Sequence, residues 1–171
     1  MADMGDKLRG AGLRVTEEPR RDDKGGGGGH GGNPRDRSGG GNAFPPGYPK
    51  YFTDDGYTNV DMLMRDAERI ADRFDDEKLK RHQLRAFYDH AKRQLQRLQY
   101  GAPFGEVHPQ IARLKALAAD RAARRQNPIP PRFKEFIDRN IDAVADQKSF
   151  EKGFMPHFEA VVGYCSRLRE V

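Results

Sequence analysis

The chain has 171 residues, of which 33% are charged and 36% hydrophobic, and its formal net charge is +5. This length suggests one domain with additional segments. With no long apolar run and no apolar stretch near the start, we expect neither a transmembrane helix nor a secretory signal. Cys165 is the only cysteine, so no internal disulfide is expected and a cytoplasmic location is favoured. The basic surplus favours a nucleic-acid partner without establishing one.

A glycine-rich segment makes up the first 47 residues, which hold 14 of the 19 glycines. Between Leu13 and Phe44 only Val15 and Ala43 are apolar, too few to offset the entropy of ordering. We therefore predict a disordered tail over 1–47 and a helical domain over 48–171. The domain has 23 basic and 19 acidic residues, a net +4. A glycine–arginine arm that contacts RNA is an alternative for the tail, but RGG units are not repeated, which favours a passive extension.

Apolar residues at helical spacing predict two helices at the start of the domain. The first covers "NVDMLMRDAERIADRF" (59–74), with an N-cap at Thr58 or Asn59. Its apolar stripe consists of Val60, Leu63, Met64, Ala67, Ile70, Ala71 and Phe74. The second helix is longer. It is predicted to run from a cap at Asp75–Asp76 to about Tyr100, where "YGAPFGE" breaks it.

Three more helices are predicted in the second half. One has Pro109 in its first turn and ends at "NPIPP". The next covers "RFKEFIDRNIDAVA" (132–145), and its buried side consists of Phe133, Phe136, Ile137, Ile141 and Val144. The last, in "SFEKGFMPHFEAVVGYCSRLRE" (149–170), either is kinked by Pro156 or starts there. Its apolar side consists of Phe154, Phe158, Val161, Val162, Cys165 and Leu168. No segment alternates like a strand, so we predict an all-α, compact bundle of about five helices.

Motifs of common enzymes and metal sites are missing from the sequence. The glycines lie in the tail rather than in a phosphate-binding loop followed by Lys-Ser/Thr. His82 and His90 lie near one face of a helix, but no third ligand completes a metal site, so we interpret them as solvated or packing residues. Cys165 falls on an apolar stripe, as a structural thiol does. Capping explains the acidic pairs Asp54–Asp55 and Asp75–Asp76. We expect no enzyme activity, no metal and no cofactor.

Basic residues around "HQLRAFYDHAKRQLQRL" (82–98) gather beside the apolar stripe of the second helix. On a wheel of about 100° per residue, counted from Leu79, they span roughly 200–260° and the apolar residues roughly 80–180°. This basic stripe consists of Lys78, Arg81, Arg85 and Lys92. Its spacing of about one residue per turn, ~5.4 Å, suits an RNA backbone. The alternative is that these side chains only keep the helix soluble.

The third predicted helix adds a second basic cluster, which consists of Arg113, Lys115, Arg121, Arg124 and Arg125. Two clusters in one small bundle put nucleic-acid binding on equal terms with the solubility interpretation. Four aromatic residues precede the first helix: Tyr48, Tyr51, Phe52 and Tyr57. They could stack on bases, although packing of the chain onto the bundle is the favoured interpretation.

Three motifs, in order, resemble one protein family. They are "HQLRAFYDHAKR" (82–93), "IARLKALAADRAARR" (111–125) and "FMPHFEAVVGYCSRL" (154–168). They resemble signatures of the small subunit of type III-A CRISPR effector complexes, the Csm small subunit. "AERIADRF" also fits, and the resemblance covers about residues 51–169. It implies a non-catalytic helical subunit, present in several copies, that contacts the guide RNA–target RNA region and supports antiviral target binding.

The resemblance also implies partners and residues. The partners are guide RNA, target RNA, the backbone and large subunits, and further copies of the chain, with no membrane. The residues that match family positions are Gln83, Arg85, Lys92 and Arg124. With the basic stripe and the last three arginines of the second cluster, the predicted RNA-binding residues are Lys78, Arg81, Gln83, Arg85, Lys92, Arg121, Arg124 and Arg125.

Two other functions stay open at this point. The chain could be a protein–protein scaffold whose basic face docks acidic partner subunits without touching RNA. It could also be an unrecognised hydrolase that uses Asp/Glu and His, which we rank last.

Overall fold

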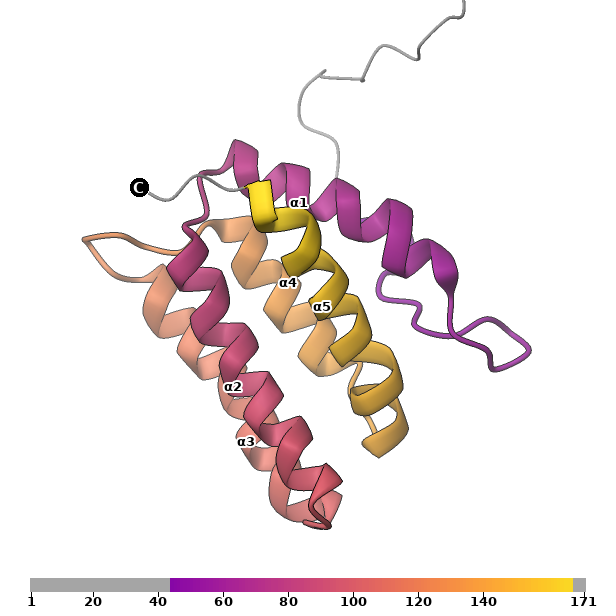
Figure 1. The fold of residues 1–171 in the computed structure, drawn as a ribbon. Coiled ribbons are helices and arrows are strands. Elements are labelled where there is room, and N and C mark those ends of the chain that lie inside the picture. Colours follow the sequence, from indigo (N-terminus) through magenta and orange to yellow (C-terminus); the bar gives the residue numbers. More distant parts are fainter. Residues whose placement is uncertain (1–43, 168–171) are drawn as a thin grey trace, which may run out of the picture. The chain divides into compact units, whose positions relative to one another are not determined.

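The computed structural model describes residues 44–167 (Figure 1). Its five α-helices are α1 (Ala67–Asp76), α2 (Arg81–Gln99), α3 (Phe104–Ala122), α4 (Pro131–Asp142) and α5 (Met155–Tyr164). π-helical turns at Met62–Asp66 and Ser149–Phe154 precede α1 and α5, and the 3-10 turn Cys165–Arg167 follows α5. Within 44–167 the only β pairing is an isolated bridge between Phe52 and Thr58, so the predicted all-α fold is confirmed. Apart from its last four residues, the predicted tail lies outside the described residues.

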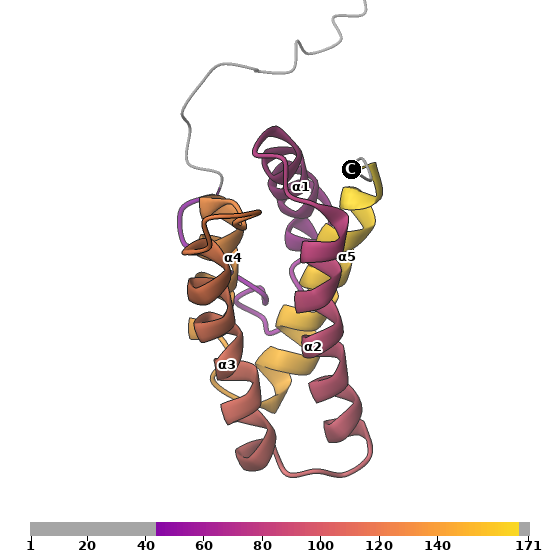
Figure 2. The same cartoon turned by 90° about the vertical axis from the view of Figure 1, so that its left-hand side faces the viewer.

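The helices pack around a core of phenylalanine rings. α2 and α3 lie side by side as an antiparallel pair (Figures 1 and 2), α4 packs against α3, and α5 packs against α1 and α2. The ring of Phe133 in α4 meets Phe74 of α1 edge-on at 5.3 Å and Phe87 of α2 at 5.0 Å. Such pairs contribute about 0.5–1.5 kcal/mol each beyond the area that they bury. None of the helices in the described residues is long and apolar enough to cross a bilayer.

The predicted core of the last two helices is confirmed. The residues expected on the buried side of α4 are all buried, namely Phe133, Phe136, Ile137, Ile141 and Val144. Of the two alternatives for Pro156, the second is correct: α5 begins at Met155, with Pro156 in its first turn. Phe154, Phe158, Val161 and Cys165 are buried as predicted, and Val162 is only partly buried. Leu168 lies outside the described residues.

The predicted stripe of the first helix is wrong at its start. Val60 and Met64 are 59% and 56% exposed, and Met62 is buried in their place. The cause is the π-helical turn at Met62–Asp66, because the next buried position, Ala67, follows Met62 at i+5 rather than at i+3 or i+4. A π turn shifts the register of every residue before it by about 100° relative to an α-helix.

The predicted start of α2 is also wrong. Asp75 and Asp76 end α1 rather than cap α2, which begins at Arg81. The backbone N–H of Leu79 donates to the carbonyl of Phe74 at 2.9 Å, and that of Lys78 donates to Asp75 at 2.9 Å. This pair of bonds defines a Schellman motif, which requires a left-handed residue, here Lys78 with φ 58°. Lys78 therefore lies in a turn and not on α2.

α3 begins earlier than predicted. Its first residue is Phe104, after Pro103 in extended conformation, and Pro109 lies inside the helix. A proline in this second turn gives up the backbone bond to the carbonyl four residues before, at Gly105, and leaves the rest of the helix intact. The proline was therefore a misleading start signal.

The segment before α1 is tied into the core. Tyr48 and Tyr51 are buried, as the packing interpretation predicted, and Phe44 is buried with them. Tyr51 donates to the side-chain oxygen of Asn140 in α4 at 2.8 Å. Tyr57 differs from the prediction, because its ring is 75% exposed.

Candidate nucleic-acid interface

The outer face of α2 carries basic side chains without acidic partners. The helix has five basic residues and one acidic residue, Asp89, a net charge of +4. Among the described residues, no carboxylate forms an ion pair with the α2 side chains that follow the first turn, which are Arg85, Lys92, Arg93 and Arg97. We call these four residues the α2 basic face. All four are exposed.

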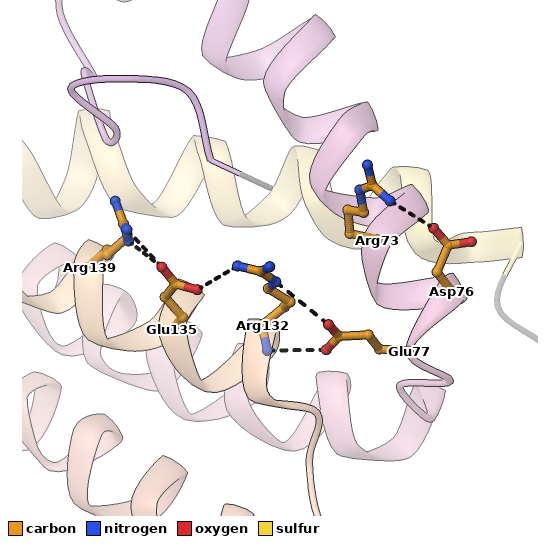
Figure 3. A network of polar contacts seen from close by, with 6 residues as sticks. All are labelled: Arg73, Asp76, Glu77, Arg132, Glu135 and Arg139. Carbon is orange, nitrogen blue, oxygen red and sulfur yellow. Dashed lines mark hydrogen bonds and ion pairs between the residues drawn. The ribbon is translucent and has the colours of Figure 1, made fainter. Parts of the chain in front are cut away.

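The basic residues of α4 are neutralised, by contrast. α4 has three basic and three acidic residues. Figure 3 shows Arg132 between Glu77 and Glu135, with Arg139 on the other side of Glu135. Arg139 lies 2.7 Å from Glu135, and Lys134 lies 2.5 Å from Asp138. Such surface pairs add little to stability, but they neutralise the positive charge that would otherwise attract a polyanion.

Local contacts orient two residues of the α2 basic face, Lys92 and Arg97. On a helical wheel Arg85, Lys92 and Arg93 fall within about 100° of one another, opposite the buried stripe of Leu84, Phe87 and Leu98. Lys92 lies 5.6 Å above the ring of Tyr88, and Arg97 donates to the side chain of Gln94 at 3.2 Å. The ammonium and guanidinium groups still face solvent, so their donors are available to a ligand.

Only two of the four residues of the predicted basic stripe belong to the α2 basic face. Arg85 and Lys92 lie on α2 as predicted, two turns or about 10 Å apart. Lys78 lies outside the helix, and the guanidinium of Arg81 donates to the carbonyl of Ser166 at 2.8 Å. The predicted spacing of one basic residue per turn is therefore wrong. Arg93 and Arg97 were missed, although the same wheel places them on the exposed side.

Gln83 is buried and has a structural role. It is 5% exposed, and its side-chain oxygen accepts from the backbone N–H of Lys80 at 3.1 Å. Its amide nitrogen donates to the carbonyl of Asn127 at 2.8 Å. Because both ends of the amide are engaged, we leave Gln83 out of the candidate interface.

The second predicted cluster is spread along α3 and the loop after it. Arg113 and Lys115 lie in the middle of the helix, and Lys115 pairs with Asp142 at 2.5 Å. The other three residues lie where α3 ends, at the end of the α2–α3 pair where α2 begins. The loop after α3 is fastened to the start of α2, because the ammonium of Lys80 also donates to the side chain of Asn127, at 2.9 Å. Of the cluster, Arg124 pairs with Asp120 at 2.8 Å, and Arg125 is exposed. Arg121 is half-buried, and its Nε atom has no partner among the described residues.

The remaining residues considered for chemistry have packing roles. His90 hydrogen-bonds the carbonyl of Gln110 through Nε2 at 2.9 Å, and Cys165 is buried. His157 is buried between Tyr48 and the carbonyl of Met62, and burial lowers its pKa to about 4. Residues 44–167 hold no group of three His, Cys, Asp or Glu that could bind a metal ion.

Residues 57–170 match the family described as Csm2 Type III-A, which is two thirds of the chain. The chain belongs to this family. It is therefore a small subunit of a type III-A Csm complex. No curated protein and no solved structure matches the chain.

The matched region of the Csm2 family contains all five helices and every residue predicted for RNA binding, from Lys78 to Arg125. It begins at Tyr57, after Tyr48 and Tyr51. The family match thus identifies the subunit, and the charge distribution on its helices indicates which face to test.

Proposed function

We propose that this subunit holds RNA without cleaving it, through the α2 basic face together with Arg125 in the loop after α3. The observation that carries the proposal is the contrast between α2 and α4. The cations of α4 are paired with carboxylates, whereas those of the α2 basic face have no acidic partner among the described residues. Unpaired cations in a row bind phosphates and do not read base sequence.

The proposed ligand is the guide RNA–target RNA region of the Csm complex. Base pairing between the two strands would provide the sequence specificity, and the small subunit would contact the backbone. The proposed protein partners are the backbone subunit, the large subunit and further copies of this chain. The working compartment is the cytoplasm, where transcripts are available to an RNA-guided complex.

The test is fluorescence anisotropy of the full chain with labelled single-stranded RNA over a series of salt concentrations. The variant is Arg85→Glu with Lys92→Glu. A matched control with the same change in net charge is Lys50→Glu with Arg65→Glu, since these exposed cations already pair with Asp54 and Asp61. Circular dichroism verifies that all three proteins are helical.

We expect the α2 variant to bind RNA more weakly and its salt slope to fall by about 1.4, at about 0.7 per lost phosphate contact. The control should keep the wild-type slope. An α2 variant that matches wild type in both affinity and slope rejects the proposal. If the α2 variant keeps RNA binding but no longer co-purifies with the other Csm subunits, the face instead docks acidic proteins. Incubation of wild type with labelled RNA and Mg²⁺ tests the non-catalytic role, and cleavage would contradict it.

A further inference from the structure

Tyr100, at the C-terminal end of α2, has a conspicuously exposed side chain. The residue is 90% exposed, more than any other large hydrophobic residue in the described part of the chain. The other three, Tyr57, Val60 and Met64, lie close together in the sequence before α1. Around Tyr100, by contrast, the exposed residues are mostly polar or small, and Pro103 is the exposed apolar residue closest in sequence. The neighbours Gln96, Gln99 and Gly101 are polar or small, and all are exposed.

The backbone beneath Tyr100 is held by a second Schellman motif. The N–H of Ala102 donates to the carbonyl of Arg97 at 3.0 Å, and that of Gly101 donates to Leu98 at 2.9 Å. Gly101 takes the left-handed conformation with φ 90°, which glycine adopts without strain. Tyr100 is the C-cap, and its own N–H donates to Gln96 at 2.9 Å. The ring is therefore presented from a fixed position and not from a loose loop.

Tyr100 continues the α2 basic face. It lies one turn beyond Arg97 and about 12 Å beyond Lys92 along the helix. On the wheel it falls between Lys92 and Arg97, on the side away from the core. The end of α2 lies at the tip of the α2–α3 pair, where the chain turns towards α3 (Figure 1). The face thus offers several cations along α2, followed by an aromatic ring at its C-cap.

We infer that Tyr100 stacks on an unpaired base of an RNA strand whose phosphates lie along the α2 basic face. The inference rests on the proposed function and adds to it the kind of RNA that this end of the subunit accepts. Positive grooves that track the backbone, combined with aromatic rings that stack on bases, are the usual means of binding single strands. A protein partner would be expected to find a broad apolar patch around the ring, whereas the exposed side chains of this end of α2 are those of Gln96, Arg97 and Gln99. The ligand at Tyr100 is therefore a single-stranded or locally unpaired stretch of RNA.

The test compares Tyr100→Ala and Tyr100→Phe with wild type and with the Arg85→Glu, Lys92→Glu variant, all as full chains. The probes are a labelled oligouridine, the same strand with one fluorescent adenine analogue, and inorganic polyphosphate, which has charge but no bases. We expect Tyr100→Ala to weaken RNA binding by about 5- to 100-fold. Its salt slope and polyphosphate affinity should stay unchanged, because no cation is lost. Quenching of the adenine analogue should disappear in Tyr100→Ala and persist in Tyr100→Phe.

The outcomes separate this inference from the proposed function. If Tyr100→Ala binds and quenches like wild type while the α2 double variant loses binding, the stacking role is overturned and the proposed function stands. If both behave like wild type, both are rejected. If Tyr100→Ala keeps RNA affinity and loses another Csm subunit on co-purification, Tyr100 is a protein contact and the inference is overturned.

Discussion

The hydroxyl of Tyr48 and the Nε2 atom of His157 lie 2.8 Å apart inside the core. The other ring nitrogen, Nδ1, lies 2.7 Å from the carbonyl of Met62, which can only accept, so Nδ1 carries the proton. Nε2 therefore accepts from Tyr48, whose oxygen accepts from the amide of Asn140 at 2.7 Å. A doubly protonated ring would leave the hydroxyl hydrogen of Tyr48 without an acceptor in this network, so the neutral ring is favoured.

The first prediction concerns pH. Burial lowers the pKa of His157 to about 4, against about 6.5 in the unfolded chain. Between these values the unfolded chain binds a proton that the folded chain does not. The free energy of unfolding is therefore highest, with respect to this group, above pH 6.5. It falls as the pH is lowered towards 4, and the total loss is up to about 3 kcal/mol. Urea unfolding at a series of pH values measures this slope. His157→Gln should flatten it, and a variant with the wild-type slope would show that other groups cause the loss.

The second prediction concerns a close approach of Gly153 to Tyr51. A Cβ atom on Gly153 would lie 2.7 Å from the Cγ and Cδ2 atoms of the Tyr51 ring. The ring is held by its bond to Asn140 and cannot yield easily. Gly153→Ala should therefore lower the free energy of unfolding by about 1–3 kcal/mol.

A matched control for this prediction is Gly163→Ala in α5. A Cβ atom there meets nothing within 4 Å, so the substitution should stabilise the helix by about 0.5–1 kcal/mol. Thermal unfolding of both variants measures the two effects. Equal changes of the same sign would mean that the Tyr51 contact does not limit the size of residue 153.

The third prediction tests the position of Lys78. In the left-handed turn that ends α1, Lys78→Gly should raise the free energy of unfolding by about 0.5–1 kcal/mol, because glycine takes this conformation without strain. Inside a helix the same change would instead cost about 1 kcal/mol. A higher urea midpoint for Lys78→Gly would thus confirm that residue 78 lies in the turn. A lower midpoint would place it in the helix that the sequence predicted.

The fourth prediction concerns Glu77, which caps a helix from a distance. Its Oε2 atom accepts from the backbone N–H of Arg132 in the first turn of α4 at 3.1 Å, where the preceding residues are prolines (Figure 3). Glu77→Ala should destabilise the chain by about 1 kcal/mol, as the loss of an N-cap does. The effect should be smaller in Glu77→Gln, which keeps an acceptor. Asp76→Ala serves as the control, since the 3.5 Å pair of Asp76 with Arg73 is exposed.

The helices and most of the core could be predicted because apolar spacing is a local property. Phe133, Phe136 and Ile137 fall on one side of any α-helix through them. The errors came where the backbone departs from the α-helix without a distinctive sequence. The π turn at Met62–Asp66 moved Val60 and Met64 to the surface, and a lysine stands where glycine usually marks a helix end.

The candidate site was predictable only in part. The wheel correctly placed Arg85 and Lys92 outside the buried stripe, although they lie opposite it rather than beside it. It did not show that Gln83 is buried, because a glutamine at a helix start is compatible with either environment. Whether a cation is neutralised depends on residues far away in sequence, as Glu77 and Arg132 illustrate. From the sequence, Tyr100 is predicted only as the end of a helix. The sequence does contain a sign that Tyr100 is exposed. The residue stands directly before the glycine that ends the helix, and at this end of the helix no core residues cover the ring.

The buried tyrosines before α1 separate two boundaries that are often treated as one. The region that defines family membership begins at Tyr57, but the bonds that satisfy Asn140 and His157 come from Tyr48 and Tyr51. A fragment trimmed to the homologous region would lose Phe44 and both tyrosines from its interior. Each orphaned polar group would then destabilise it by about 1–3 kcal/mol. The unit that folds thus starts upstream of the unit that homology recognises, and a minimal fragment of this subunit should begin no later than Phe44.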